Sequence, residues 1–256
     1  EVLFMKFKIL FFMAFLSTQS FGKSFTVCME PKGVFPLYQE KGKKGKLPGL
    51  YLEMLKSMEK KLNLRTKIKR RPFKRCLSSL KAGRVDAVAS ASYKEFRKEF
   101  GVYPFFRGKL HSRWRISASS YYLYSRKRAP KVWDGKKFNR FNGSIAAVRG
   151  YSIVTDLKDL KVPTKEVSKI EQAFTMVSKN RVFGVAAHEN DGHRLMKKHN
   201  LKQSKIPLAK KDYFLLLSHQ FVKRDKNFAE KVWKTVAEIR ESKPFQKVKD
   251  RYLMKG

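Results

Sequence analysis

Hydrophobic positions along the chain follow two alternating patterns. Short apolar runs typical of buried strands are separated by segments in which apolar residues recur at every third or fourth position, as in amphipathic helices. The runs predict strands at 25–29, 65–69, 85–91, 121–125, 144–148, 165–168, 182–187 and 212–219. The periodic segments predict helices at 50–62, 72–82, 152–157, 170–177, 190–199, 228–237 and 244–253. This alternation predicts an α/β fold with mostly parallel sheets flanked by helices.

Three segments lack either pattern and are predicted to be irregular. They are a loop at 30–47 with an exposed basic tip at 40–46, a basic stretch at 106–120, and a loop at 129–142. Glycine, proline and clustered charge are typical of such connections.

A weak internal repeat predicts two lobes. Residues 79–89 can be aligned with residues 176–186, and in both segments a helix ends in a polar turn and leads into a small apolar strand. Each half of the chain therefore repeats one α/β plan. We expect a first lobe formed by 23–112 plus 212–256 and a second lobe formed by 113–211, with hinges near 106–121 and 208–214.

The segment 70–105 contains a candidate receptor for a carboxylate. Pro72 can start a helix and Gly83 can end it, and an apolar strand then runs toward Ser90 and Ser92. A second short helix begins near residue 93 and carries Arg97. A hydroxyl at a strand end, the free N–H groups of a new helix and a forked guanidinium bind carboxylates well. The alternative is a surface helix with a solvated arginine.

The charge of the chain is extreme. The 256 residues include 59 Lys and Arg but only 21 Asp and Glu, which gives a net charge of +38. Such a charge attracts nucleic acid, acidic lipid and acidic cell-wall polymer. The basic residues are spread along the whole chain, however, which favours a property of the compartment over a dedicated nucleic-acid face.

One cluster keeps nucleic-acid binding open as an alternative. Tyr121, Tyr122 and Tyr124 precede the basic segment 126–128, and such a cluster resembles a patch on which bases stack. The competing interpretation is a hinge strand with half-buried aromatic residues.

The N-terminal residues are typical of an export signal. Lys6 and Lys8 precede the apolar run 9–16, and the small residues Ser20 and Gly22 follow it. We expect a signal peptide at 1–22 with a short upstream extension, and an exported, soluble protein in the periplasm. In that oxidising compartment, Cys28 and Cys76 form either one disulfide or two separately buried thiols.

Several ordered motifs carry a family resemblance. They are 49–55 (Gly-Leu-Tyr-Leu-Glu-Met-Leu), 80–87 (Leu-Lys-Ala-Gly-Arg-Val-Asp-Ala), Ser92 followed five residues later by Arg97, and the pair Tyr103-Pro104. Their order and spacing resemble the bacterial periplasmic solute-binding proteins of the polar amino-acid type, family 3. The resemblance implies a type II two-lobe clamshell that closes on a small solute by hinge motion.

It also implies the partners. We expect a monomer that binds a small carboxylate-bearing solute for ABC-type import and delivers it to a permease of the inner membrane. We expect no specific nucleic acid, no cofactor and no catalysis.

The resemblance further assigns ligand-binding residues by position. Ser90, Ser92 and Arg97 correspond to the carboxylate site. The aromatic wall corresponds to Phe35 or Tyr38 and to Phe73, and Glu30 is expected in the same cleft. From the second lobe come Arg149, Gly150 and Ser152 at a helix N-terminus, and His188 with Glu189 where the family usually has an Asp for the amino group.

The segment 188–193 also suggests a metal site. It holds two histidines with Glu189 and Asp191, although their spacing is not that of a helical zinc motif. The alternative is a polar strand-to-helix turn. No nucleophile elbow or phosphate-binding glycine loop is present, which argues against an enzyme. Two other functions stay open: an exported basic protein that binds nucleic acid or anionic envelope polymer, and a solo sensory domain.

Overall fold

The computed structural model describes residues 22–31, 33, 35–39 and 47–253. The predicted signal peptide, except for its last residue, and the predicted basic tip at 40–46 lie outside the described residues. None of the helices that the structure describes has the length and apolar character needed to cross a bilayer.

The α/β prediction is confirmed. The strands are β1 (Lys23–Met29), β2 (Leu64–Arg70), β3 (Ala87–Ser92), β4 (Phe105–Phe106), β5 (Lys109–Leu110), β6 (Ser117–Arg126), β7 (Ile145–Val148), β8 (Thr164–Val167), β9 (Gly184–His188), β10 (Leu201–Gln203) and β11 (Ala209–Leu217). The α-helices are α1 (Leu50–Leu62), α2 (Phe73–Lys81), α3 (Ser152–Asp159), α4 (Ile170–Ser178), α5 (Glu189–Met196), α6 (His219–Arg224), α7 (Lys226–Glu241) and α8 (Lys243–Leu253). Two 3₁₀ helices, η1 (Glu95–Glu99) and η2 (Ser112–Trp114), complete the described elements.

One curled sheet runs through the whole molecule in the order β2-β1-β3-β11-β6-β9-β7-β8, and β10 pairs with β6. The strands β2, β1 and β3 are mutually parallel, and so are β8, β7 and β9. Between these groups lie β6 and β11, which are antiparallel to each other and to their outer neighbours. The N-terminal half of β11 pairs with β6 and its C-terminal half with β3, with Tyr213 at the change.

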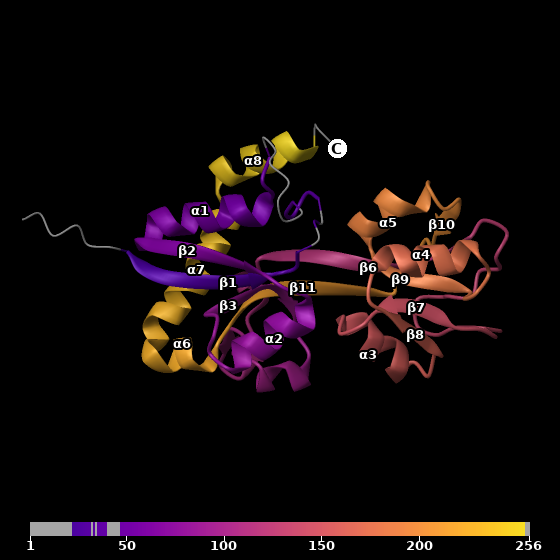
Figure 1. Cartoon of the computed structure of the whole chain (residues 1–256), viewed down its shortest axis with the longest axis horizontal. Helices are drawn as coiled ribbons and strands as arrows, with labels where there is room; N and C mark the ends of the chain where they lie inside the picture. The colour runs from indigo at the N-terminus through magenta and orange to yellow at the C-terminus, as the bar shows by residue number, and fades with distance from the viewer. Residues whose placement is uncertain (1–21, 32, 34, 40–46, 254–256) are drawn as a thin grey trace, which may run out of the picture.

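Helices cover the two ends of this sheet separately (Figure 1). We call the part with β1–β3, α1, α2 and α6–α8 the first lobe, and the part with β7–β10 and α3–α5 the second lobe. Only β6 and β11 extend between them in the figure. This arrangement is the two-lobe, type II architecture that the sequence predicts.

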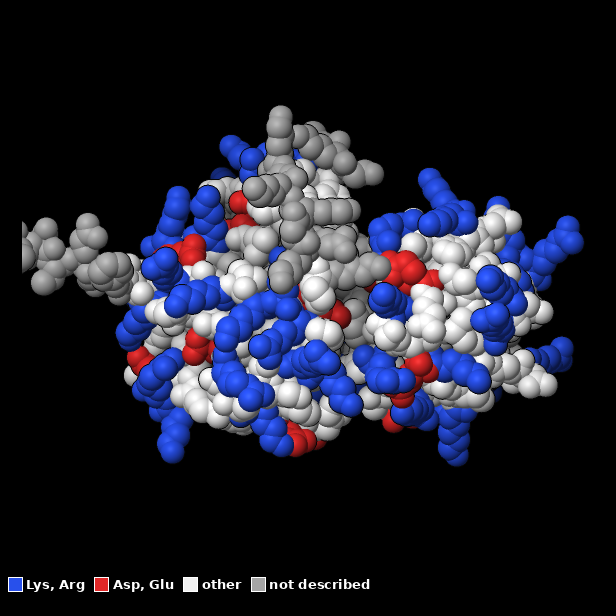
Figure 2. All heavy atoms as spheres, viewed as in Figure 1, with Lys and Arg blue, Asp and Glu red and all other residues white. Residues whose placement is uncertain are grey.

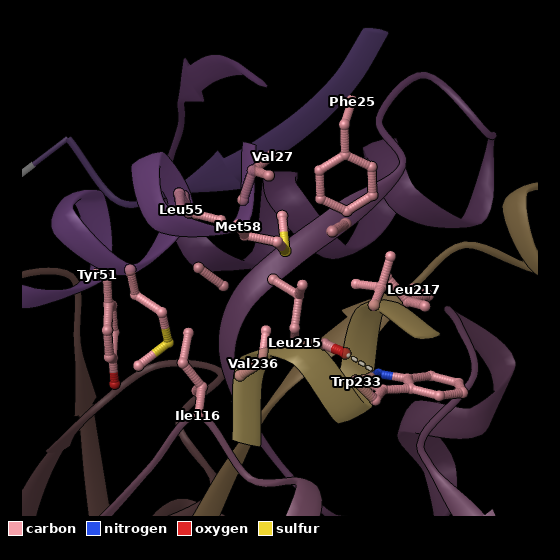
Figure 3. Packing of buried hydrophobic residues seen from close by; sticks show 14 of the residues in the cluster. Phe25, Val27, Tyr51, Leu55, Met58, Ile116, Leu215, Leu217, Trp233 and Val236 are labelled. Carbon is pink, nitrogen blue, oxygen red and sulfur yellow. Dashed lines mark hydrogen bonds between the residues drawn. The ribbon is translucent and has the colours of Figure 1, made fainter. Parts of the chain in front are cut away.

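The first lobe has its main core under α1 and α7. Met58 of α1 and Val236 of α7 pack with Val27 and Leu215 of the sheet, and all four are fully buried (Figure 3). The Trp233 indole Nε1 donates to the Leu215 carbonyl at 2.8 Å, so the polar atom of a buried ring is satisfied. The second lobe has cores of its own on both faces of its sheet, around Phe174 and around Leu157.

The disulfide, left open by the sequence, is formed between Cys28 of β1 and Cys76 of α2. It ties the carboxyl half of β1 to the helix that precedes β3. By closing a long loop in the unfolded chain, such a bridge stabilises a fold by roughly 2–4 kcal/mol.

The basic stretch 106–120 was predicted to be irregular, and this is partly wrong. It contains the β4–β5 hairpin, η2 and the first residues of β6. Ser117 to Ser120 carry no apolar pattern, yet they pair with β11 through the main chain. The sequence also missed α6 and β10, which are too short to show a period.

The limits of the lobes stay a proposal, but the contacts favour one adjustment. Trp114 stacks on Trp233 with ring centroids 6.3 Å apart, and Ile116 lies in the core of the first lobe. The carbonyl of Arg113 accepts from the Arg240 guanidinium at 2.9 Å. We therefore place residues 113–116 with the first lobe and propose that the connection begins at β6.

Candidate functional site

Most of the predicted site residues line one cavity of about 60 Å³ between the lobes. Eight of the twelve predicted residues line it: Glu30, Tyr38, Phe73, Ser90, Ser92, Arg97, Ser152 and His188. Their role in ligand binding stays a prediction, but the fold brings them together from the segment between β1 and α1 and from α2, β3, η1, α3 and β9.

The other four predicted residues do not line the cavity. The ring of Phe35 is 39% exposed and lies against Tyr252 instead. Arg149 points outward and pairs with Glu166 at 3.8 Å. Glu189 begins α5 beside the cavity, and its side chain is absent from the lining. Gly150 contributes only its carbonyl, which accepts from Arg97.

Arg97 is the charged centre of the first lobe's side of the cavity. It is 1% exposed, although η1 is short and mostly exposed. Its Nη1 donates to the carbonyl and the hydroxyl of Ser92 at 2.8 and 3.0 Å, and its Nη2 donates to the Gly150 carbonyl at 2.9 Å. Its Nε is buried without a hydrogen-bond partner among the described residues. The guanidinium also lies over the Phe73 ring, 5.0 Å from its centroid.

Ser90 has an unusual backbone for a strand residue. Its φ is +66°, and the pairing of β3 with β11 shifts register opposite it, between Phe214 and Leu216. The Tyr51 hydroxyl lies 3.0 Å from the Ser90 hydroxyl and 2.6 Å from that of Ser117. A left-handed conformation in a residue with a side chain is held only when its surroundings enforce it. At Ser90, this conformation is accompanied by a row of hydroxyl groups, those of Ser90, Tyr51 and Ser117, along the cavity wall.

Besides the hydrogen bond from Arg97 to the Gly150 carbonyl, three polar contacts join the two lobes around the cavity. The Ser92 hydroxyl donates to the Ser152 hydroxyl at 2.9 Å, at the first residue of α3. The Tyr151 hydroxyl donates to the Glu30 carboxylate at 2.9 Å. Outside them, Lys94 pairs with Asp156 of α3 at 2.7 Å. The cavity wall is therefore continuous only when the lobes are together.

Glu30 is the acidic group of the cavity. It follows β1, and burial raises the pKa of its carboxyl to about 7, with a further rise from nearby Asp191 and an opposing effect from the Tyr151 hydroxyl. No lysine or arginine of the described residues pairs with this carboxylate, although Arg70 donates to the main-chain carbonyl of Glu30 at 2.9 Å. Asp191, the other acid of the lining, accepts from Arg194 at 3.0 Å.

His188 ends β9, as predicted, and is held by aromatic groups. Its ring stacks on Tyr121 with centroids 3.9 Å apart, and the Tyr213 hydroxyl lies 3.2 Å from Nε2. Burial, reinforced by the charge of Lys211, lowers the pKa of His188 to about 3. The imidazole is therefore neutral near pH 7 and cannot replace a carboxylate as the partner of a cation.

Sequence reasoning missed more than half of the lining. The missed residues are Leu37, Tyr51, Ala89, Ser117, Ser119, Tyr121, Tyr151, Asn190, Asp191 and Tyr213. Most are tyrosines and serines from the edges of predicted elements. Tyr51 was assigned to the apolar face of α1, which is correct for its ring, but its hydroxyl reaches the cavity. Polar residues at the ends of β6 and β9 were the available signal.

Two alternative sites are not supported. The proposed base-stacking patch would need exposed rings, but Tyr121 and Tyr124 are 2% and 0% exposed. Basic residues instead cover both lobes on the face shown in Figure 2, without a single stripe. For the metal hypothesis at 188–193, no group of three or more His, Cys, Asp or Glu in the described part of the chain is placed to hold an ion.

Known structures share this fold. An ancestral arginine-binding protein bound to glutamine is 18% identical, with a TM-score of 0.68 over 90% of this chain and 97% of that one. The substrate-binding protein of an amino acid ABC transporter is 18% identical, with a TM-score of 0.68 over 90% and 99%. A histidine kinase sensor domain with similarity to periplasmic binding proteins is 14% identical, with a TM-score of 0.70 over 91% and 97%. No match was found among curated protein sequences.

The sequence itself matches a family model. The model describes bacterial extracellular solute-binding proteins, family 3, and it covers residues 26–255. That range includes both lobes and every described residue of the cavity. The protein therefore belongs to family 3 of the bacterial extracellular solute-binding proteins.

Proposed function

We propose that the protein captures a small carboxylate-bearing solute between its lobes, in the periplasm, and delivers it to an ABC-type permease. The observation that carries this proposal is the environment of Arg97. Its guanidinium is buried, its contacts are to neutral oxygens, and it forms no ion pair with a carboxylate of the described residues. Burying a charge without a counter-ion costs several kcal/mol. A carboxylate bound in the adjoining cavity would offset that cost.

Glu30 suggests the second group of the solute. The cavity encloses this acid without a cationic partner among the described residues, and burial keeps its pKa near 7. A cationic group of a ligand would stabilise its ionised form. The proposed solute is therefore a zwitterion whose carboxylate faces Arg97 and whose cation faces Glu30. Because His188 is neutral, we place the cation partner directly after β1, at Glu30, and not at the end of β9.

The binding step is tested by ligand-induced thermal stabilisation. The panel contains neutral, acidic and basic amino acids, small peptides, dicarboxylates and amines without a carboxylate. Only solutes that carry both a carboxylate and a cationic group should raise the Tm. Arg97→Ala should abolish the shift, because the carboxylate loses its bidentate partner. A ligand at a hundred times its Kd stabilises by about 2.7 kcal/mol, which is readily measured.

The matched control is Arg113→Ala, which removes an exposed arginine outside the cavity. It should shift with ligand as the wild type does. If a ligand stabilises Arg97→Ala as strongly as the wild type, the carboxylate site is wrong. If only amines without a carboxylate stabilise the protein, the proposed class of solute is wrong.

The delivery step needs a separate experiment. A strain that lacks this protein should lose high-affinity uptake of the identified solute and regain it with the wild-type gene, but not with Arg97→Ala. Unchanged uptake together with lost transcriptional response to the solute would favour a sensory role. This alternative uses the same cavity and the same fold.

A further inference from the structure

The β4–β5 hairpin exposes aromatic side chains on the first lobe, away from the cavity. It has the two-residue turn Arg107-Gly108, in which both residues have positive φ, 48° and 75°. Such a turn matches the twist of paired strands and makes a short, regular hairpin. Phe105 and Phe106 are 40% and 55% exposed. A Cβ on Gly108 would meet nothing within 4 Å, so the turn projects into open space.

Basic side chains surround these rings. The Arg107 guanidinium lies over the Phe106 ring at 5.3 Å, and the Lys98 ammonium lies over the Phe105 ring at 5.7 Å. Lys109 and Arg113 are also exposed. Arg107, Lys109 and Arg113 have no acidic partner among the described residues. We call Phe105, Phe106, Arg107, Lys109 and Arg113 the hairpin surface.

The remaining contacts of the rings show that the hairpin has a fixed shape. Phe105 packs edge-on against Tyr93 at 5.7 Å, and Phe106 packs edge-on against His111 at 5.8 Å. His111 in turn stacks on Trp114 at 4.3 Å. The exposed aromatic area is thus presented by a supported element, and it is not the result of a loose loop.

The shape and chemistry of the hairpin surface favour one partner. Stacking of nucleic-acid bases needs free ring faces, whereas a cation or a neighbouring ring already lies against these rings. A protein partner would need a groove shaped to the projecting tip and to the cationic side chains around it. A bilayer interface accommodates such a tip directly, because aromatic rings are favoured at headgroup level and Lys and Arg are attracted to anionic lipids.

We propose that the hairpin surface is a membrane-contact element, which inserts Phe105 and Phe106 into the headgroup region of a bilayer that contains anionic phospholipid. The insertion holds the protein at the membrane through the first lobe and leaves the cavity free. This proposal does not depend on the identity of the solute.

The test is flotation of the protein with vesicles of phosphatidylcholine containing about one-third phosphatidylglycerol, against vesicles of phosphatidylcholine alone. The double variant Phe105→Ser/Phe106→Ser should partition into the mixed vesicles at least tenfold more weakly than the wild type. Ile206→Ser, which removes an exposed apolar residue on the second lobe, should partition as the wild type does. Equal partition of the double variant and the wild type would overturn the proposal, because diffuse charge would then account for all binding.

Matched charge variants separate the hairpin from the overall charge of +38. Arg107→Gln/Lys109→Gln and Lys161→Gln/Lys165→Gln each remove two exposed positive charges, one pair from the hairpin and one from the second lobe. The variant Arg107→Gln/Lys109→Gln should bind vesicles several-fold more weakly than the variant Lys161→Gln/Lys165→Gln. Equal losses would contradict a local contact.

A second readout does not depend on binding strength alone. Phe106→Trp should show a blue shift of its added emission with mixed vesicles, compared with the wild type, because its indole leaves water. An unchanged spectrum on bound protein would overturn insertion. Binding of a single-stranded oligonucleotide that is lost in Phe105→Ser/Phe106→Ser, with vesicle binding retained, would identify a nucleic-acid surface and reject the membrane proposal.

Discussion

At the scale of single residues, the cavity contains charges that are favourable for a ligand and unfavourable for folding. Arg97 is buried and Glu30 lines the cavity half-buried, and neither side chain forms an ion pair with an opposite charge among the described residues. Sites of this kind are expected where function and stability conflict. The conflict makes a prediction for Glu30 that can be tested without knowing the solute.

Glu30→Gln should stabilise the ligand-free protein at neutral and alkaline pH. The pKa of the Glu30 carboxyl is about 7 in the folded protein and 4.5 in the reference state. Between pH 4.5 and pH 7, the folded protein therefore keeps a proton on Glu30 that the unfolded chain has released. The contribution of Glu30 to the free energy of unfolding therefore falls as pH rises from about 4.5 to 7. Above pH 7 the variant should be more stable by about 1–3 kcal/mol.

Denaturant unfolding at pH 5 and pH 8 measures this difference. The gain should be large at pH 8 and small at pH 5. Glu238→Gln changes an exposed acid of α7 and should show no such dependence. In Glu30→Gln, a solute with a carboxylate and a cationic group should bind more weakly than in the wild type, because its cation no longer faces the Glu30 carboxylate. A Glu30→Gln protein that is equally stable or less stable at pH 8 would contradict the assignment.

The sequence predicted the charged residues of the site better than its hydroxyl groups. Arg97 and Ser92 follow a recognisable motif, and the motif carries the placement of the guanidinium. Tyr151 and Tyr213 belong to no such motif. The Tyr151 hydroxyl reaches Glu30 of the first lobe from the turn before α3, and the Tyr213 hydroxyl of β11 reaches His188 at the end of β9. That juxtaposition depends on long-range pairing, which periodicity does not encode.

At the scale of elements, the helices and strands with a clear period were placed correctly, whereas β4, β5, α6 and β10 were missed because they are too short to show one. α1, α4 and α7 each bury one apolar face, which fixes their period in the sequence. β6 extends over Ser117–Arg126, but its first residues are polar because they line the connection between the lobes and the cavity wall. Main-chain pairing alone keeps them extended.

The helix α5 depends on a glycine in its middle. Gly192 is buried, and an added Cβ would lie 1.8 Å from Cζ of Tyr124, which is itself fully buried. The Tyr124 hydroxyl donates to Gln203 at 3.1 Å, and its ring packs on Phe174, so it has little room to move. Alanine would normally favour a helix by about 1 kcal/mol, but overpacking costs roughly 1–3 kcal/mol or more.

Gly192→Ala should therefore lower the Tm by roughly 5 °C. His193→Ala, at the next and exposed position of the same helix, should leave the Tm within about 1 °C of the wild type, since surface changes are small. Thermal unfolding followed by circular dichroism measures both. An unchanged Tm for Gly192→Ala would show that α5 does not pack on Tyr124 this closely.

At the scale of the whole molecule, two lobes with separate cores are joined through β6 and β11. Closure is then a matter of a few polar contacts across the gap and of the Tyr151 ring, which packs edge-on against Phe73 with centroids 6.3 Å apart. The ion pair of Lys94 with Asp156 lies outside the cavity, and both side chains are about four-fifths buried, with 18% and 21% exposed. Lys211 of β11 also pairs with Asp156.

Lys94→Met should speed the release of the bound solute without unfolding the protein. The substitution removes an ion pair between the lobes, while Asp156 keeps Lys211 as its counter-ion. A partly buried pair worth about 1 kcal/mol shifts the balance of closed and open forms roughly fivefold, and the affinity falls by the same factor. Lys98→Met, which breaks a pair within η1, is the control. Stopped-flow dissociation of the solute should be faster in the first variant and unchanged in the second. If both variants release it at the wild-type rate, the two lobes are held together by the ligand and the cavity contacts alone.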